Sequence, residues 1–420
     1  MQKINSLKIS RFIFCITLFL IIQTVIGING WTNLTFHEHT ISTDCMGALY
    51  ACTIDIDLDG DIDIVTSAFN SDKISWWENS DYDFTEHVID DSFDGVIHIN
   101  VVDLDDDGDI DVLGGSQQGN ELAWWENDGL TFTKHVVAMN ILEAHSLYSE
   151  DIDKDGDLDL FSTSNNDISW WENDGQQIFT QHTLINRLFS STQGFIRYIY
   201  ALDLDDDTDI DFISGDNVWG SAVNVDTIYY WLNDGNQNFI QKTVEGVSYA
   251  QFHGFHIIDL DQDGDIDLLA TNPSENQIDW FENDGQLNFT QYTIVTSFNG
   301  ANDLDVADLD KDGDLDLIAV AYFDDKISLF ENNGSQNFTE EVLREDFDGA
   351  HFCMFSDINK DGLYDILGLA WEGDEVSWWE QIDTGDTSTS STSTSSAASF
   401  GMETIVMSCI VVILLKYKRK

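Results

Sequence analysis

The chain has 420 residues, of which 42% are hydrophobic and 12% aromatic, so it can bury a core and is not a disordered acidic polypeptide. Its formal net charge of −61 argues against nucleic acid as a partner, because nothing in the composition offsets repulsion from phosphates. Pro273 is the single proline, which favours a chain built mostly from hydrogen-bonded strands.

Residues 1–27 predict a signal peptide. Lys3, Lys8 and Arg11 precede an almost unbroken apolar run that continues to Ile26, and small residues follow near Gly27. A retained N-terminal anchor is the alternative. The pattern therefore predicts export of the chain.

From residue 31 to residue 383 the chain repeats an acidic loop of nine residues. Acidic or amide side chains stand at alternate positions, and a glycine usually stands at the sixth. The loops begin at Asp55, Asp103, Asp151, Asp203, Asp259, Asp308 and Asp357, at intervals of 48 to 56 residues. Self-similarity at such a period is the signature of a repeat protein.

One repeat is clearest in residues 96–139. An apolar run at 96–102 precedes the acidic loop, and three further strand patterns follow it at 110–113, 121–125 and 131–136. The Asp128-Gly129 pair between the last two predicts a tight hairpin turn. Four short antiparallel strands per repeat, seven times over, predict an all-β fold, a seven-bladed β-propeller over residues 31–383.

The chain does not begin and end on whole repeats, because its first strand pattern is of the fourth kind and its last is of the third. The chain starts with a lone fourth-strand pattern at 35–41, and the last repeat stops after Trp379 without one. We therefore expect the N-terminal strand to complete the last blade and close the ring, which leaves no open sheet edge. An open solenoid is the alternative, but it would require capping repeats.

The composition changes after Asp383. Residues 384–396 are almost all Ser and Thr and predict an extended stalk. Residues 397–415 are mostly apolar and predict a membrane anchor or a cleaved sorting segment, with 416–420 as a basic cytoplasmic tail. These segments together predict an exported protein anchored at the cell surface by its C-terminus.

The acidic loop has the chemistry of a hard-cation site. Positions one, three, five and nine offer side-chain oxygens, position seven a backbone carbonyl, and glycine at six permits a positive φ. Ca²⁺ takes six to eight oxygens on a flexible loop, and Mg²⁺ is the alternative ion. The predicted ligands are Asp55, Asp57, Asp59 and Asp63; Asp103, Asp105, Asp107 and Asp111; Asp151, Asp153, Asp155 and Asp159; Asp203, Asp205, Asp207 and Asp211; Asp259, Asp261, Asp263 and Asp267; Asp308, Asp310, Asp312 and Asp316; and Asp357, Asn359, Asp361 and Asp365.

Two loops depart from the pattern. The fourth carries Thr208 in place of glycine, and a β-branched residue resists a positive φ, so this site is expected to be the least suited to an ion. The seventh carries Asn359 and Leu363, but every ligand position still bears oxygen. We expect up to seven structural calcium ions, with the fourth in doubt.

The motif Asp-x-Asp-x-Asp-Gly-x-x-Asp at this repeat length resembles the FG-GAP/VCBS repeat over residues 31–383. That family includes the propellers of integrin α-subunits and many secreted bacterial and archaeal surface proteins. The Phe-Gly and Gly-Ala-Pro sequences of some members are absent from residues 31–383. The resemblance implies that each loop joins the first two strands of a blade and binds Ca²⁺ structurally.

Three cysteines fall within the repeats, Cys45, Cys52 and Cys353. An odd number argues against a disulfide framework, and buried free thiols are expected, with one bridge left open.

Strand direction sorts the loops onto two faces of the ring. The acidic loops share one face and are uniform, whereas the loops on the other face vary, and variable loops are where a propeller would carry recognition. His145, Arg197, His253, Asn302 and His351 each stand six residues before an acidic loop and are predicted near the mouth of the central channel. Trp219, Tyr322 and Trp371, with Phe69 and Phe323, are the aromatic candidates on the variable loops. A hydrated channel lining and packing between loops are the alternatives.

The sequence contains no nucleophile motif, no Gly-rich phosphate loop and no His/Cys metal cluster. We therefore expect a non-enzymatic binding or adhesion module for a protein or glycan ligand at a cell surface. The alternative is a secreted carbohydrate-active enzyme, a polysaccharide lyase or hydrolase, with its site at the channel mouth. The repeated Trp-Trp-Glu segments are interpreted as packing between sheets.

Overall fold

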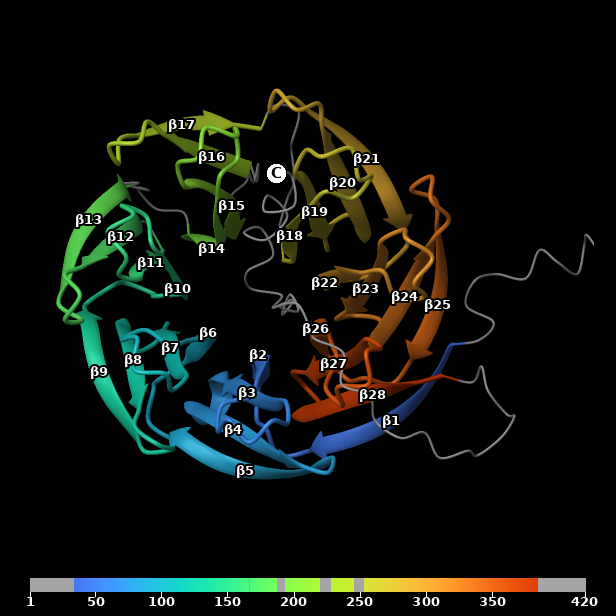
Figure 1. The fold of residues 1–420 in the computed structure, drawn as a ribbon. Helices are drawn as coiled ribbons and strands as arrows, with labels where there is room; N and C mark the ends of the chain where they lie inside the picture. The colour runs from blue at the N-terminus through green and yellow to red at the C-terminus, as the bar shows by residue number, and fades with distance from the viewer. Residues whose placement is uncertain (1–33, 166, 187–192, 220–227, 245–252, 384–420) are drawn as a thin grey trace, which may run out of the picture.

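The computed structural model describes residues 34–383, except residue 166 and segments 187–192, 220–227 and 245–252. The described chain forms seven four-stranded antiparallel sheets arranged as blades around a central axis (Figure 1). The predicted all-β propeller is thereby confirmed.

The strands follow one another from the axis outward in every blade, and the last blade is completed by the N-terminal strand. Blade one comprises β2 (Ala48–Ile54), β3 (Asp63–Ala68), β4 (Lys73–Ser80) and β5 (Asp83–Asp90). Blade two comprises β6 (Val96–Val102), β7 (Asp111–Ser116), β8 (Glu121–Asn127) and β9 (Phe132–Met139). Blade three comprises β10 (Ser146–Glu150), β11 (Asp159–Thr163), β12 (Asp167–Asn173) and β13 (Phe179–Asn186). Blade four comprises β14 (Gln193–Leu202), β15 (Asp211–Trp219), β16 (Ile228–Asn233) and β17 (Phe239–Thr243). Blade five comprises β18 (Phe255–Ile258), β19 (Asp267–Asn272), β20 (Gln277–Asn283) and β21 (Phe289–Thr296). Blade six comprises β22 (Ala301–Ala307), β23 (Asp316–Ala321), β24 (Lys326–Asn332) and β25 (Phe338–Arg344). Blade seven comprises β26 (Ala350–Ser356), β27 (Asp365–Ala370), β28 (Glu375–Asp383) and β1 (Leu34–Ser42).

The hydrophobic core lies between neighbouring blades. Every residue of β7 is buried, because this strand is covered on both faces. In β8, Trp125 packs with Val65 and Trp76 of blade one, whereas Trp124 packs with Leu147 of blade three. Successive side chains of a strand point to opposite faces, so the two tryptophans fill the two interfaces of one blade. The interpretation of the Trp-Trp-Glu segments as packing is confirmed.

The ring closes through the N-terminal strand, as the phase of the repeats predicts. β1 pairs antiparallel with β28, with Leu34 opposite Asp383. Arg344 of blade six strengthens the junction, since its Nη1 donates to Glu38 Oε1 at 2.6 Å and to Glu375 Oε1 at 2.7 Å. The closure brings the first and last described strands into one sheet.

Cys45, Cys52 and Cys353 are buried free thiols, which confirms that prediction for the described cysteines. Burial raises the pKa of the Cys45 thiol to about 11. Burial also raises the pKa of the Cys353 thiol, so Cys45 and Cys353 are protonated and unreactive at neutral pH.

The predicted localisation is corrected. Within the described part of the chain, no helix is long and apolar enough to cross a membrane. The segments that carried the prediction, 1–27, 384–396, 397–415 and 416–420, lie outside the described residues. The assignment to a cell surface through a C-terminal membrane anchor is therefore withdrawn.

Candidate functional site

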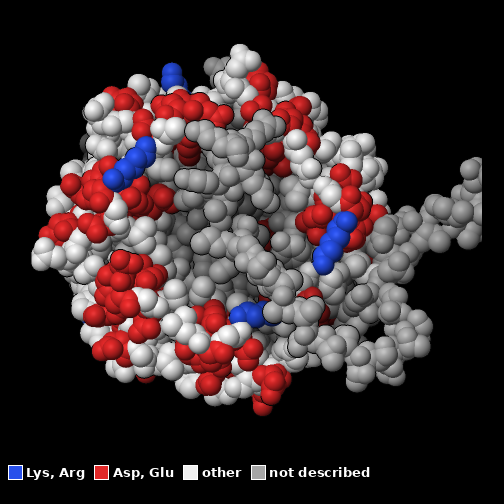
Figure 2. Space-filling model, viewed as in Figure 1, with Lys and Arg blue, Asp and Glu red and all other residues white. Residues whose placement is uncertain are grey.

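The acidic loops each connect the innermost strand of a blade to the second strand, as Asp103–Asp111 does between β6 and β7. Acidic side chains gather in separate groups around the ring (Figure 2). Carboxylate oxygens from three aspartates of one loop approach one another within 4.8 Å, for example those of Asp55, Asp57 and Asp63. This spacing brings like charges together and could hold a hard cation.

The loop holds its carboxylates by backbone hydrogen bonds. In blade one, Gly60 N donates to Asp55 Oδ2 at 3.1 Å, and Asp61 N donates to Asp59 Oδ1 at 2.9 Å. Gly60 has a φ of +106°, so the chain can wrap around the carboxylates. Short bonds within the loop thus aim several side chains at one point.

Position one of the loop provides a test of whether an ion fits. The Oδ1 atoms of Asp55, Asp151, Asp259 and Asp308 are buried and accept no hydrogen bond. A buried carboxylate oxygen without a donor is costly, and the same atom recurs in four loops. A divalent cation among these oxygens would satisfy them, so the residues present fit the predicted ion.

The aspartate at position nine has a second role that the sequence did not suggest. In blade one, Asp63 Oδ2 accepts from Ile56 N at 3.2 Å, and its Oδ1 accepts from Asn79 N at 2.8 Å. Asn79 in turn donates from Nδ2 to Ile62 O at 2.9 Å. Burial raises the pKa of Asp63 to about 7, although these N–H donors oppose the rise. Position nine therefore anchors the loop to the third strand.

The same pair recurs in the other blades, and the signal for it was the asparagine that ends the third-strand pattern in blades one to six. Blade seven replaces the asparagine with Gln381, whose backbone N donates to Asp365 Oδ1 at 2.8 Å. The position-nine aspartates and their partners are Asp63 with Asn79, Asp111 with Asn127, Asp159 with Asn173, Asp211 with Asn233, Asp267 with Asn283, Asp316 with Asn332, and Asp365 with Gln381.

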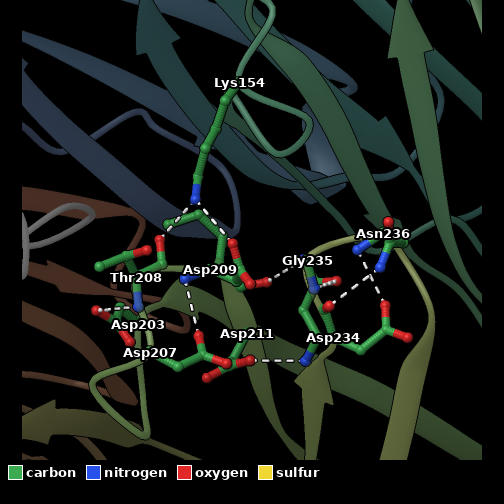
Figure 3. Close-up of polar contacts among 11 residues, drawn as sticks. Lys154, Asp203, Asp207, Thr208, Asp209, Asp211, Asp234, Gly235 and Asn236 are labelled. Atoms are coloured by element: carbon green, nitrogen blue, oxygen red, sulfur yellow. Dashed lines mark hydrogen bonds and ion pairs between the residues drawn. The ribbon is translucent and has the colours of Figure 1, made fainter.

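The loop of blade four keeps its shape despite Thr208. Thr208 adopts a φ of +81°, and its N donates to Asp203 Oδ2 at 3.2 Å, as the glycine of blade one does. Lys154 of the neighbouring blade supports it, since its Nζ donates to Thr208 O at 2.7 Å and to Asp209 Oδ1 at 2.9 Å (Figure 3). The threonine is strained, and the arrangement of the carboxylates is retained.

Relief of this strain gives a testable prediction. Thr208→Gly is expected to stabilise the protein by about 1 kcal/mol. A β-branched residue at positive φ costs the folded state about 1–3 kcal/mol. Glycine removes this strain, but it also gives the unfolded chain more conformational freedom, and this offsets part of the gain. Lys154 bonds to the backbone carbonyl at this position, so the substitution leaves its hydrogen bond in place. The midpoint of denaturant unfolding measures the change, and Gly108→Thr in the second loop should shift it in the opposite direction.

The loop of blade seven also takes the common shape. Gly362 N donates to Asp357 Oδ2 at 2.9 Å, and Asp361 N donates to Asn359 Oδ1 at 3.0 Å. Leu363 at position seven changes only a side chain, as expected, because that position would contribute its carbonyl.

Four pairs of neighbouring loops are linked by the residue at position four, a feature that sequence reasoning missed. Besides Lys154, Gln262 Nε2 donates to Gly313 O at 2.6 Å and Lys311 Nζ donates to Gly362 O at 2.5 Å. Lys360 Nζ donates to Gly60 O and so joins the seventh loop to the first. The signal was a long donor side chain at one loop position, but its partner lies in the next blade.

The opposite end of the channel holds a second candidate site, here called the channel-mouth cavity. It has a volume of about 370 Å³ and receives side chains from five blades. It is lined by Leu49, Tyr50, Phe69, Ile97, His98, Gln117, His145, Asp303, Tyr322, His351, Phe352 and Trp371. Five predicted candidates thus meet in one place: Phe69, His145, Tyr322, His351 and Trp371.

The other predicted ligand residues either lie beside the cavity or have side chains outside the described part of the structure. His253 Nδ1 and Asn302 Oδ1 are 2.7 Å apart, and Asn302 Nδ2 donates to His351 O at 2.6 Å, so both residues support a cavity wall. Arg197 and Trp219 belong to β14 and β15, but their side chains lie outside the described residues.

Two rows of rings border the cavity. In one row, Trp371 lies 5.6 Å from Phe69 and 5.8 Å from His351, and Tyr322 lies 6.4 Å from His351, measured between ring centroids. In the other row, Tyr50 lies 4.7 Å from Phe352 and 4.0 Å from His98. The aromatic side chains therefore pack on one another and also face the cavity.

Tyr50, His98, Asp303 and Phe352 were not identified from the sequence. His98 is buried, and Tyr148 Oη lies 2.9 Å from its Nε2. Burial lowers the pKa of His98 to about 3, so its imidazole stays neutral at physiological pH. These residues lie on the innermost strands, and alternation along those strands was the available signal.

Comparisons with known proteins agree with the fold. The FG-GAP-like repeat model matches residues 103–162, 151–214 and 259–319. No curated protein sequence matches the chain at a significant level. Solved structures that resemble it include BBS1N in complex with ARL6DN, at 10% identity and a TM-score of 0.57, covering 85% of this chain and 99% of that one.

Two further structures resemble the chain more weakly. One is an Agrocybe aegerita lectin described as recognising non-reducing terminal N-acetylglucosamine, at 19% identity and a TM-score of 0.49, covering 75% of this chain and 82% of the lectin. The other is a luciferin-regenerating enzyme, at 9% identity and a TM-score of 0.47, covering 84% of this chain and 96% of that one. At these identities the likeness concerns the fold alone.

Proposed function

We propose that this chain, an FG-GAP-repeat β-propeller protein, is a binding module that recognises a glycan or protein ligand in its channel-mouth cavity without transforming it chemically. The proposal takes the acidic loops as structural and assigns recognition to the opposite end of the channel. The ring would then have a structural role on one face and a binding role on the other.

The observation that carries the proposal is the contrast between the two faces. The acidic loops repeat one set of bonds in every blade, whereas each blade that reaches the cavity contributes different side chains. A concave site with mixed ring and polar lining is the usual form of a small-ligand site, and a volume of about 370 Å³ suits one small chemical group or sugar. Uniform loops serve the scaffold, and the unlike lining provides selectivity.

We propose Ca²⁺ as the ion of the acidic loops. Side chains at positions one, three, five and nine would hold it with the carbonyl of position seven, and the buried oxygens at position one support this assignment. The ion would supply the positive charge that the clustered carboxylates require. Mg²⁺ is less suited, because it demands a stricter octahedral geometry and keeps more of its water.

An enzyme is the competing function, with its chemistry at the same cavity. A catalytic role would need an acid or base within reach of a reacting atom, and His145 and His351 are the residues placed for it. Neutral, buried His98 bonded to Tyr148 is better suited to support the wall. We therefore favour binding.

The test is a glycan and protein array probed with the purified full chain in calcium buffer. We expect binding with no product released, and Trp371→Ala should weaken it by about tenfold or more, as truncation of a buried aromatic anchor does. Tyr292→Ala is the matched control, because this ring stacks on Trp280 on an outer strand, away from the cavity. Release of product from a polysaccharide, lost in His145→Ala, would establish the enzyme instead.

A further inference from the structure

Four of the acidic loops receive a hydrogen bond from the preceding blade at the same peptide unit. In the loops of blades four, six, seven and one, the carbonyl of position six accepts from the position-four side chain of the blade before. The N–H of that same peptide belongs to position seven, and it donates to the position-five carboxylate. Figure 3 shows this arrangement in blade four, where Lys154 reaches Thr208 O and the next N–H donates to Asp207. These four contacts are here called the inter-loop links.

The link from blade five to blade six shows what such a contact does to a ligand residue. Gln262 Nε2 donates to Gly313 O at 2.6 Å, and Asp314 N donates to Asp312 Oδ1 at 2.9 Å. A peptide unit is planar, so a donor that fixes its C=O also orients its N–H. Hydrogen bonds in series polarise one another, which makes that N–H a stronger donor. The link therefore helps to hold the Asp312 carboxylate in the place where it would contact the ion.

Position four is itself held by the ligand residues on either side of it. Its φ is positive in all four links, between +56° and +62°, at Lys154, Gln262, Lys311 and Lys360. A residue other than glycine keeps this conformation only where its surroundings impose it. Here the N–H of position five donates to the side chain of position three, as Asp312 N does to Asp310 Oδ1 at 3.1 Å. Positions three and five, both proposed ion ligands, thus enclose position four in a turn and direct its side chain to the next loop.

The links do not run all the way round the ring. All seven loops belong to the described part of the chain, and in loops one, two and four the residue at position four is Leu58, Asp106 or Asp206. Neither leucine nor an ionised aspartate has a side-chain N–H to donate to a carbonyl. Loops five, six, seven and one are therefore joined in series, loops three and four form a pair, and loop two has no link of this kind. The series crosses the closure of the ring, from Lys360 to Gly60 O.

We propose that the inter-loop links couple ion binding in neighbouring loops, so that the loops of blades five, six, seven and one take up Ca²⁺ as one cooperative group. This inference rests on the assignment of Ca²⁺ to the loops in the proposed function. The position-four side chain of one loop fixes the position-six peptide of the next, and that peptide fixes a ligand there. Coupling of this kind is reciprocal, so each of two linked loops raises the affinity of the other by the same factor.

Gln262 is the residue best suited to a test, because it is exposed and uncharged. A lysine link also places a charge beside the ligands, since Lys360 Nζ lies 3.9 Å from Asp55 Oδ2. Removing such a lysine would mix the loss of a hydrogen bond with a change in charge. Gln262→Met removes the donor at constant charge and nearly constant length. Gln262→Lys supplies a donor again, as Lys311 does in the next loop.

Hydrogen exchange of the loop-six amides, followed by mass spectrometry of the full chain as free Ca²⁺ is varied, tests the inference. Asp263→Asn weakens the loop-five site and keeps an acceptor for Asp265 N. This substitution should raise the Ca²⁺ concentration that half-protects loop six by about threefold to tenfold, the range expected of one hydrogen bond. In a Gln262→Met background the shift should vanish, and in a Gln262→Lys background it should return.

Loops one and two provide the matched control, because Leu58 supplies no donor between them. Asp59→Asn in loop one is equivalent to Asp263→Asn in loop five, and it should leave the half-protection of loop two unchanged. The measurements are made in about 0.15 M KCl, which screens interactions between exposed charges of different loops.

Two results would overturn the coupling. One is a loop-six shift that is absent from the start or that persists in Gln262→Met, and the other is an equal shift in loop two, which would place the coupling in the sheets or the solvent. If Ca²⁺ protects the loops while the Gln262 variants behave alike, the proposed ion stands and only the coupling is wrong. If Ca²⁺ protects none of the loops, the proposed ion is wrong and the coupling fails with it.

Discussion

A calcium chelator is expected to lower the melting temperature of this protein by about 10 °C or more at low ionic strength. Each ion that binds only the folded state adds about 2.7 kcal/mol when its free concentration is a hundredfold above Kd. Removal of the ions also leaves three carboxylates within 4.8 Å of one another in each of the first five loops, and these repel. Several loops lose this stabilisation together, which is why the expected effect is large.

Calorimetry with and without chelator measures the shift. Restoring Ca²⁺ should recover the full melting temperature, and Mg²⁺ should recover less of it, because the loop suits a larger ion with more ligands. Raising the NaCl concentration in chelator should recover a part, since salt screens the exposed carboxylates. A melting temperature that chelator leaves unchanged at low salt would show that the loops are acidic turns without an ion.

Asp316→Ala is expected to destabilise the protein by about 3–5 kcal/mol, because it removes an ion ligand and a buried structural acceptor together. Asp316 Oδ1 accepts from Asn332 N at 2.9 Å and its Oδ2 accepts from Leu309 N at 3.1 Å. Each buried N–H left without an acceptor costs about 1–3 kcal/mol. Denaturant unfolding in calcium buffer measures the loss.

Asp312→Ala separates the two contributions. Asp312 is an exposed residue of the same loop, and its Oδ1 accepts an exposed hydrogen bond from Asp314 N at 2.9 Å, which water can replace. In chelator the effect of Asp312→Ala should largely vanish, whereas most of the effect of Asp316→Ala should persist. Equal losses for the two variants in chelator would mean that position nine acts only through the ion.

The sequence predicted the strands well because each repeat encodes them locally. β6 begins and ends as expected, and β7 begins at Asp111, one residue after the predicted start. The acidic loop and the Asp-Gly turn limit each strand to a few residues, and seven copies make the pattern unambiguous. Ring closure by β1 followed from the phase of the repeats alone.

The prediction for Thr208 did not take into account the hydrogen bonds that neighbouring residues form with its backbone. Local sterics argue against a positive φ, and the structure nevertheless has +81° at this residue. Hydrogen bonds from Thr208 N to Asp203 and from Lys154 to Thr208 O keep the loop in its common shape. A contact from the next blade outweighs a local preference, and no local pattern reports such a contact.

The amino-acid sequence by itself determined the number of blades, the position of every acidic loop and the closure of the ring, because these depend on short patterns that recur at a fixed period. Only the tertiary structure decided which residues share the channel-mouth cavity. Tyr50 lies near the start of the propeller sequence and Trp371 near its end, with Asp303 between them. They meet because the closed ring brings the first and last blades together. The side chains that line this cavity therefore form one site only after the ring has closed.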